Sequence, residues 1–432
     1  MTAILAWSRI PLRWRITTFL AAAAILNYAA RATISSVFAA LRQDLGISDI
    51  ALGILGAAFL WSYALCSPVA GFLADRYSRS RIVAWSLALC SIFTVLTGAS
   101  WGYSMLLVFL LCLGLAQGLY LPSAIALLAD HHGPRTRGLA MGIHSVGLYF
   151  GMVIGGAFAG YLAEHFGWRS GFWVLGLVGV ILTFCAKFVL RDNSKELIKP
   201  ATPPSVVVAL RYIAKVPSYH LLLAKTMLAG IGIWTFINWL PLYFSETFKM
   251  SLGMAGFAGM FMLQIPTMLG IATGGWISDR VAVRNARQRM LFQALCYFCA
   301  APFLLPFLNR PGFILVTVAV SVFSLLRGLG QANENPILCD VIPPQFRSTA
   351  IGFMNCLSTA AGGAGVLLAG ILKGGWGLNA VFAGISIIFV IAGAALLVGY
   401  FIFMPRDTQR ARDYEVAMAA AAPIAPPDAA RR

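Results

Sequence analysis

The sequence predicts an all-α membrane protein with twelve transmembrane helices in two pseudo-symmetric six-helix halves. Three observations support this: the composition, the recurrence of long apolar windows and an internal repeat. The 432 residues are 59% hydrophobic and only 11% charged, whereas a soluble domain carries about 25% charged residues. The chain therefore has too few polar side chains to cover a water-soluble fold.

The apolar windows define the predicted spans. A bilayer core about 30 Å thick needs roughly 20 apolar residues in a helix. The N-terminal half, residues 1–190, and the C-terminal half, residues 218–405, each contain six such windows. They lie near 16–38, 50–72, 82–99, 104–128, 138–162 and 170–190, and near 219–244, 253–277, 290–308, 312–338, 349–371 and 379–403.

Two segments lie outside the halves. Residues 191–217 are polar and contain four prolines, so they predict a cytoplasmic linker between the halves. Residues 406–432 are rich in alanine and proline and predict a disordered cytoplasmic tail. The arginines near the N-terminus precede an apolar run that continues past Arg31, which indicates an uncleaved first helix and not a signal peptide.

The net charge of +17 would suggest nucleic-acid binding in a soluble protein. With an N-terminus in the cytoplasm, 23 of the 32 Lys and Arg residues fall in cytoplasmic segments, five in outer loops and four within spans. This bias follows the positive-inside rule. It predicts a multi-pass protein of the inner (plasma) membrane with both termini cytoplasmic and no nucleic-acid partner.

Two short motifs occur in both halves. Gly71–Arg76 (GFLADR) follows the second predicted span, and Gly275–Arg280 (GWISDR) follows the eighth. Arg137 and Arg347 follow the fourth and tenth spans and stand 210 residues apart. Repeated six-helix halves are typical of transporters that alternate access to a site between the halves.

The run Gly71–Arg81 resembles the loop signature of the major facilitator superfamily, and the repeat extends that resemblance over nearly the whole chain. The resemblance implies the major facilitator fold. It also implies a cytoplasmic gate in which the loop aspartates pair with arginines. A plain positive-inside loop is the alternative, although such a loop does not need aspartates. The gate residues would be Asp75, Arg76, Arg79, Asp279, Arg280, Arg137 and Arg347.

Three stretches resemble the anion:cation symporter group, which carries organic anions such as sugar acids: Asn27–Ser35, Gly114–Pro122 and Gly167–Phe172. Spinster-like lipid transporters share parts of this pattern, including a stretch like Ile342–Ala350. The chain departs from both groups where they usually carry a carboxylate in the first and fourth helices. These positions hold Ala30 and Gln117, which leaves the usual route of proton coupling in doubt.

Arg31 is one of few charges predicted inside the membrane. Charges there are costly and are normally kept for a site or a partner. Asn27, Tyr28 and Arg31 share one helix face, and a guanidinium with amide and hydroxyl groups beside it suits a carboxylate or phosphate. The alternative is an arginine that reaches outward or pairs with another helix.

The tenth predicted span carries a second polar stripe: Arg327, Gln331, Glu334 and Asn335. Glu334 is the carboxylate placed deepest in a span, so it is the candidate coupling residue. A structural ion pair with Arg327 or Lys225 is the equally weighted alternative. Lys225 and Lys187 are expected to reach the cytoplasmic surface.

The sequence thus predicts a secondary active transporter of a small organic anion, coupled to protons and acting as a monomer in the bilayer. The alternatives are a spinster-like lipid or lysolipid carrier and an anion exchanger or uniporter without proton coupling. No metal-ligand spacing, cofactor motif or nucleophile pattern is found, so no metal, cofactor or enzymatic activity is predicted. The expected substrate-binding residues are Arg31, Tyr28, Asn27, Gln117, Arg327, Asn238, Gln331 and Asn335, and the expected proton-coupling residues are Glu334 and His144.

Overall fold

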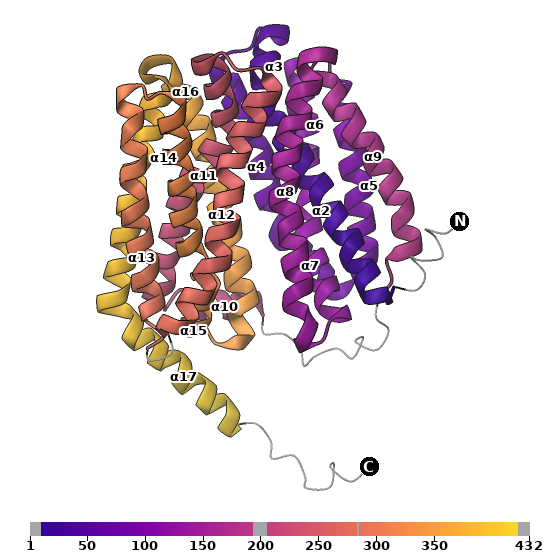
Figure 1. Cartoon of the computed structure of the whole chain (residues 1–432). Coiled ribbons are helices and arrows are strands. Elements are labelled where there is room, and N and C mark those ends of the chain that lie inside the picture. The colour runs from indigo at the N-terminus through magenta and orange to yellow at the C-terminus, as the bar shows by residue number, and fades with distance from the viewer. Residues whose placement is uncertain (1–9, 193–204, 283–284, 422–432) are drawn as a thin grey trace.

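The computed structural model describes residues 10–192, 205–282 and 285–421. Within these ranges the chain is helical and contains no β-strand, which confirms the predicted all-α class. The helices run side by side in two bundles, one from each half of the sequence (Figure 1). The N-terminal bundle consists of α2 (Leu12–Ser36), α3 (Phe38–Leu45), α4 (Asp49–Arg76), α5 (Arg79–Gly98), α6 (Tyr103–Gly118), α7 (Tyr120–His131), α8 (Pro134–Phe166) and α9 (Trp168–Val189).

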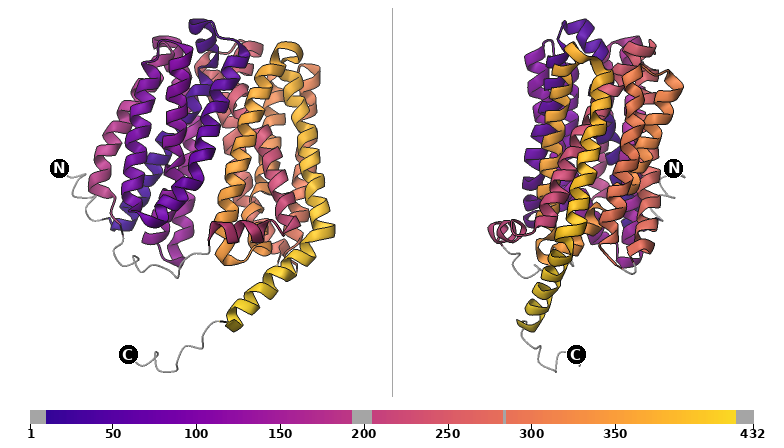
Figure 2. Two further views of the ribbon diagram at one scale, coloured as in Figure 1. Left: turned by 180° about the vertical axis from the view of Figure 1, so that it is seen from behind. Right: turned by 90° about the vertical axis from the view of Figure 1, so that its left-hand side faces the viewer.

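The C-terminal bundle follows a short linker helix. Figure 2 shows this helix, α10 (Val206–Ile213), lying across the ends of the long helices. The bundle consists of α11 (Pro217–Phe248), α12 (Leu252–Ala282), α13 (Gln288–Ala300), η2 (Ala301–Asn309), α14 (Phe313–Gln331), α15 (Glu334–Val341), α16 (Pro344–Val398), η3 (Gly399–Phe403) and α17 (Met404–Ala421).

Helix α16 contains two spans. Its 55 residues would extend about 80 Å at 1.5 Å per residue, more than twice the bilayer core. Gly377 interrupts it with a φ of 75°, a left-handed conformation that glycine adopts without strain. Gly167, 210 residues earlier, has a φ of 81° and separates α8 from α9. With α16 divided, the described residues form the twelve predicted spans.

Three spans are bent or broken, and the ninth passes from α13 into the 3₁₀ helix η2 at Ala301. Helices α2 and α3 meet at 51°. The fourth span breaks at Leu119, three residues before Pro122, and the tenth breaks at Ala332 and Asn333, before Pro336. Each proline removes a backbone N–H that would bond four residues back. The polar stripe predicted on one continuous tenth helix is therefore divided between α14 and α15.

The predicted disordered tail begins within a helix, so the structure corrects its boundary. Helix α17 covers residues 404–421, and only 422–432 lie outside the described residues. Asp407 accepts a hydrogen bond from the Ser218 amide at 2.8 Å, and Tyr414 packs edge-on against Tyr212 of α10. These tertiary contacts hold a segment whose composition alone predicts disorder.

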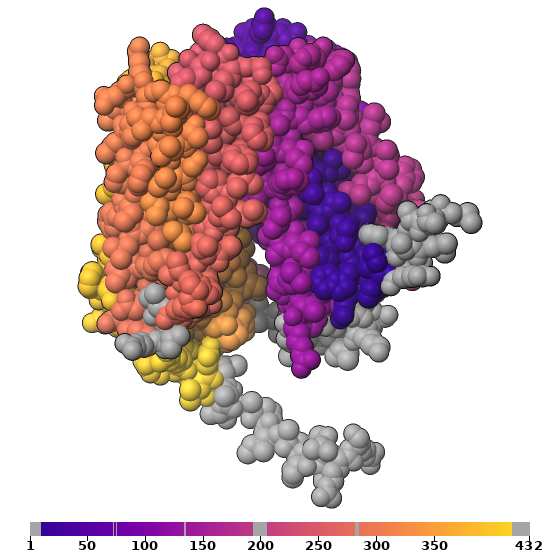
Figure 3. All heavy atoms as spheres, in the orientation of Figure 1, coloured from indigo at the N-terminus to yellow at the C-terminus, as the bar shows by residue number. Residues whose placement is uncertain are grey.

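The two bundles meet at one end and separate at the other. We call the end that carries α10, α15 and the start of α2 the basic face, and the other end the opposite face. Near the opposite face α8 packs on α12 so closely that a Cβ on Gly156 would lie 2.8 Å from the Gly256 carbonyl. In Figure 3 a cleft divides the halves toward the basic face, at the bottom of the view. The structure is therefore open toward the basic face.

Candidate functional site

Arg31 lies on α2 where the two halves meet. It is only 5% exposed, and its Nε and Nη2 atoms have no hydrogen-bond partner among the described residues. No carboxylate of the described chain pairs with it either, and Ala30 stands where the resembled groups carry an aspartate. Arg31 is thus a buried cation that the described protein leaves unpaired.

Four aromatic rings surround the guanidinium. Its Cζ atom lies 5.1 Å from the ring centre of Tyr28 on its own helix. On α4, the rings of Phe59 and Tyr63 lie at 5.0 and 4.3 Å. Trp234 of α11 approaches to 5.1 Å from the other half. All four distances are within the range of cation–π attraction, so the rings hold the guanidinium without using its hydrogen-bond donors.

The free donors of Arg31 could bind an anion. An unpaired charge in a dry site is costly, and cation–π contacts offset part of this cost but leave the hydrogen-bond donors of the guanidinium unused. A carboxylate or phosphate could accept two hydrogen bonds from the free donors of the guanidinium. The anion would then lie at the contact between the halves.

Two predicted site residues stand beside Arg31. The Gln117 Nε2 donates to the Asn27 carbonyl at 3.1 Å, which ties α6 to α2. The Asn27 Nδ2 donates to the Ala23 carbonyl, and its Oδ1 is buried without a partner. The structure thus brings Asn27, Tyr28, Arg31 and Gln117 together in the N-terminal half.

The second cluster lies in the C-terminal half. Arg327 is buried, and its two Nη atoms donate to Gln331 Oε1 at 2.6 Å and to Thr267 Oγ1 at 2.7 Å. Tyr149 of α8 lies near Arg327 and Glu334, from the other half. Arg327 therefore already has partners within the protein, although its Nε remains free.

Glu334 pairs with Lys225. The Lys225 Nζ lies 3.1 Å from Glu334 Oε2 and 5.1 Å from the ring centre of Tyr297. Lys225 is completely buried, so the expectation that it reaches the cytoplasmic surface is wrong. The pair with Glu334 keeps it inside. Lys187 does lie on the surface, over the ring of Phe184.

The remaining predicted site residues, two for substrate binding and one for proton coupling, are dispersed. The Asn238 side chain bonds to the Trp234 carbonyl and packs against Gly56 of the other half, nearer the opposite face. Asn335 is exposed at the start of α15. His144 is buried, and its Nε2 lies 3.1 Å from the Tyr120 hydroxyl inside the N-terminal half.

The predicted gate residues lie at the basic face. In the N-terminal half, Arg79 pairs with Asp130, and Arg137 donates to the His132 carbonyl at 3.2 Å. Arg76 also has an interaction partner. The side chain of Asp75 is outside the part of the chain that the structure describes.

In the C-terminal half, Arg289 joins the gate motif. It pairs with Asp279 at 3.2 Å and with Asp340 at 3.3 Å. Arg280 lies over the Trp276 ring, and Arg347 donates to the Cys339 carbonyl at 2.8 Å. These contacts stay within one half, as expected where the cleft separates the halves.

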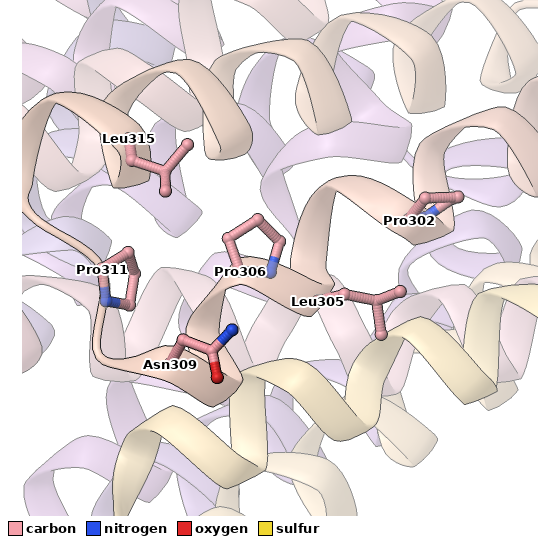
Figure 4. A pocket seen from close by; sticks show the side chains of 6 residues that line it. All are labelled: Pro302, Leu305, Pro306, Asn309, Pro311 and Leu315. Atoms are coloured by element: carbon pink, nitrogen blue, oxygen red, sulfur yellow. The ribbon is translucent and has the colours of Figure 1, made fainter.

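One pocket of the described structure lies away from these charges. It is an open groove of about 460 Å³ between η2 and α14, and Figure 4 shows its lining. Five of its six lining residues are proline or leucine and none is charged: Pro302, Leu305, Pro306, Asn309, Pro311 and Leu315. The groove has no group that would recognise an anion.

Sequence reasoning missed several neighbours of the predicted residues. Phe59, Tyr63 and Trp234 contact Arg31, but aromatic residues are too frequent in this chain to stand out. Thr267 and Arg289 bond across helices, and a sequence without aligned relatives gives no such pairing. A fully buried lysine could have been suspected, because Lys225 is among only four basic residues within predicted spans.

Comparison with known proteins identifies the family and several relatives of the chain. Residues 20–365 match the sequence profile of the Major Facilitator Superfamily. The chain is 27% identical over 433 aligned positions to the protein named "Probable galactarate/D-glucarate transporter" of Bacillus subtilis (strain 168), covering 90% of this chain and 92% of that one. It is 26% identical over 382 positions to the hexuronate transporter of the same organism, covering 83% and 87%.

A crystal structure shares the fold. A bacterial homolog of the human lysosomal transporter Spinster, in an inward-facing and unoccupied conformation, superimposes with a TM-score of 0.73 at 18% identity. The superposition covers 93% of this chain and 98% of that one. The profile match and the fold agree with the twelve spans and the duplicated motifs. The chain is therefore a multi-pass membrane transporter that belongs to the Major Facilitator Superfamily.

Proposed function

We propose that the protein is a secondary active transporter of a small organic anion of the sugar-acid or carboxylate type. The observation that carries the proposal is Arg31, a buried and unpaired guanidinium at the contact between the two halves. An alternating-access transporter holds its substrate at this kind of position. The names of the relatives, galactarate/D-glucarate and hexuronate transporters, fit a carboxylate as the ligand.

Arg327 would contact the anion from the second half, opposite Arg31. Tyr28, Asn27, Gln117, Gln331, Asn335 and Asn238 would orient the rest of the substrate, which in a sugar acid consists of hydroxyl groups. The residues are dispersed in the open state described above, so closure of the cleft would have to bring the C-terminal members toward Arg31. That movement is the rocking of residues 1–190 against 218–405.

The test is uptake by purified protein in liposomes. Wild-type protein should accumulate radiolabelled D-glucarate or a hexuronate, and Arg31→Gln together with Arg327→Gln should abolish uptake. Retained uptake by this double variant would refute the clamp. Uptake of lysophosphatidylcholine, measured in parallel, distinguishes this proposal from the lipid-carrier alternative. A lipid carrier would transport the lysolipid, and added sugar acids would not change that transport.

We further propose that transport is coupled to protons through Glu334. The Lys225–Glu334 ion pair joins two candidate membrane spans, and Tyr149 of the other half lies near Glu334. Protonation of Glu334 would break the pair, so the pair can respond to a proton gradient. His144 is the second candidate for proton transfer, through its contact with Tyr120.

The coupling test uses Glu334→Gln, which keeps the shape and removes the titratable group. Wild-type uptake should accelerate under an inward pH gradient, and Glu334→Gln should transport at a rate that the gradient does not change. Unchanged proton dependence in the variant would assign the Lys225–Glu334 pair a structural role. Wild-type transport without any pH dependence would indicate exchange or uniport.

The orientation follows from the charges. The basic face would be cytoplasmic, with both termini inside the cell and the monomer in the plasma membrane. The residues Asp75, Arg76, Arg79, Asp279, Arg280, Arg137 and Arg347 would then close the cytoplasmic side in the alternate state. Labelling of a cysteine introduced at Lys249, compared with one at Arg412, by an impermeant reagent on whole cells tests this orientation.

A further inference from the structure

Four charged residues form a closed ring at the opposite face. Arg42 of α3 and Asp49 of α4 come from the N-terminal half, and Glu246 of α11 and Lys373 of α16 come from the C-terminal half. Arg42 lies 3.2 Å from Asp49 and 2.6 Å from Glu246. Lys373 lies 2.7 Å from Asp49 and 2.9 Å from Glu246. The charges alternate in sign, so each cation contacts both carboxylates.

The ring has two kinds of contact. The pairs Arg42–Asp49 and Lys373–Glu246 each lie within one half, whereas Arg42–Glu246 and Lys373–Asp49 join the halves. If the halves separate at this face, the two joining contacts break and the two internal pairs remain. No charge is left without a partner, which avoids the large cost of an unpaired, partly buried ion.

The ring closes over an apolar layer. The Lys373 side chain is only 9% exposed, and its Nζ lies 5.8 Å from the Trp239 ring centre. Trp239 is fully buried and packs edge-on against Phe38 of the other half, with ring centres 5.5 Å apart. Helices α16 and α4 also touch here, since a Cβ on Gly370 would lie 2.7 Å from the Asp49 carbonyl.

We propose that the ring of Arg42, Asp49, Lys373 and Glu246 is a reversible latch that holds the opposite face closed. The latch stabilises the state that is open toward the basic face. It releases without exposing an unpaired charge, because each half keeps its own ion pair. The proposal rests on alternating access and not on the identity of the substrate.

The experiment reverses the two C-terminal charges together, Lys373→Glu with Glu246→Lys. This variant keeps the ion pair inside the C-terminal half but makes both joining contacts repulsive. Hydrogen–deuterium exchange of the substrate-free protein in nanodiscs should become about tenfold faster at the opposite-face ends of α4, α11 and α16. Exchange at the basic-face ends of α8 and α12 should slow as the cleft closes.

The decisive measurement uses a variant in which the charges around the ring alternate in sign again. Arg42→Asp and Asp49→Arg, added to the first two substitutions, make both joining contacts attractive again and should return exchange to the wild-type pattern. The matched control reverses the charges of an ion pair at the same face that lies within one half. In the wild type this pair joins Arg169 Nη1 to Asp44 Oδ2 at 2.7 Å, and the control variant is Arg169→Glu with Asp44→Lys. This control should leave the ends of α11 and α16 unchanged.

Two results would overturn the latch: exchange at the opposite-face ends that does not change in the double variant, or a rise that the quadruple variant does not reverse. Neither result depends on a transported substrate. Failure of the latch is therefore distinguishable from failure of the proposed anion specificity, which is measured by uptake.

Discussion

Two buried cations, one in each half, are surrounded by different kinds of partner. Lys225 in the C-terminal half is completely buried and pairs with Glu334 at 3.1 Å. Arg31 in the N-terminal half is nearly as buried, but its neighbours are four aromatic rings and its Nε and Nη2 have no partner among the described residues. Both rest against aromatic rings, so the difference is the carboxylate.

On the proposed function, this difference separates the anion-binding site from an ion pair. The protein itself supplies the counter-charge of Lys225, so that cation needs no ligand. At Arg31 the described protein supplies no counter-charge, so a ligand can supply it. Removal of Arg31 should therefore affect function more than stability, whereas removal of Lys225 should affect stability first.

The largest expected effect is that of Arg31→Gln on transport. Loss of two charge-assisted hydrogen bonds to a carboxylate weakens binding by about 3 kcal/mol, more than about 100-fold. The melting temperature should change little, because the cost of the unpaired buried charge and its attraction to the rings are both removed. Uptake kinetics in liposomes and thermal unfolding of the purified protein measure the two effects.

Arg31→Lys is the matched control, since lysine keeps the charge but not the bidentate geometry. It should transport better than Arg31→Gln and worse than wild type. A marked loss of thermal stability in both variants, with uptake reduced only in proportion to folded protein, would contradict the site.

The second-largest expected effect is the loss of stability in Lys225→Met. The substitution leaves Glu334 without its partner and should reduce the free energy of unfolding by about 3 kcal/mol. Adding Glu334→Leu removes the orphaned carboxylate and should recover most of that loss. Denaturant titration in detergent of these two variants and of Glu334→Leu alone gives the coupling energy. Equal losses in Lys225→Met and in the double variant would show that the orphaned carboxylate does not cause the loss.

Arg327→Gln sharpens the comparison within the proposed clamp. Arg327 already donates to Gln331 and Thr267, so less of its hydrogen-bonding capacity is available to a ligand. We expect about a tenfold increase in KM for the anion, which corresponds to one lost hydrogen bond to a charged group. A loss as large as that of Arg31→Gln would indicate that both halves hold the anion equally.

The sequence predicted the spans far better than the pairing of side chains. Each span follows from a long apolar run, and the breaks at Pro122 and Pro336 could be expected from the missing backbone donors. The sequence allowed two positions for Lys225, the cytoplasmic surface and a pair with Glu334, and the structure shows the pair. The ring around Asp49 joins four separate elements, so only the packing of the halves reveals it.

The candidate site divides in the same way. Asn27, Tyr28 and Arg31 share one turn region of a helix, so helical periodicity was enough to group them. The prediction of one continuous polar stripe on the tenth span is wrong beyond the break near Asn333, where α14 ends and α15 begins. Local periodicity therefore predicts a site on one helix and loses accuracy where a helix changes direction.

The smallest expected effect concerns a carboxylate outside the membrane. Partial burial alone would raise the pKa of Asp192, but hydrogen bonds from Ser78 and the Ser80 amide, together with the charge of Arg81, lower it below its ordinary value. A lowered pKa stabilises the folded state above the ordinary pKa of aspartate, and this contribution is lost as the pH falls through the folded value. The free energy of unfolding should therefore decline slightly between about pH 5 and pH 3, by under about 1 kcal/mol for so exposed a group.

The test is Asp192→Asn, which should remove this part of the pH dependence and leave uptake at pH 7 unchanged. A variant that keeps the full acid sensitivity of the wild type would show that Asp192 does not stabilise the start of α5. Because the effect scales with burial, a result here larger than that of Lys225→Met would also undermine the comparison between the two buried cations.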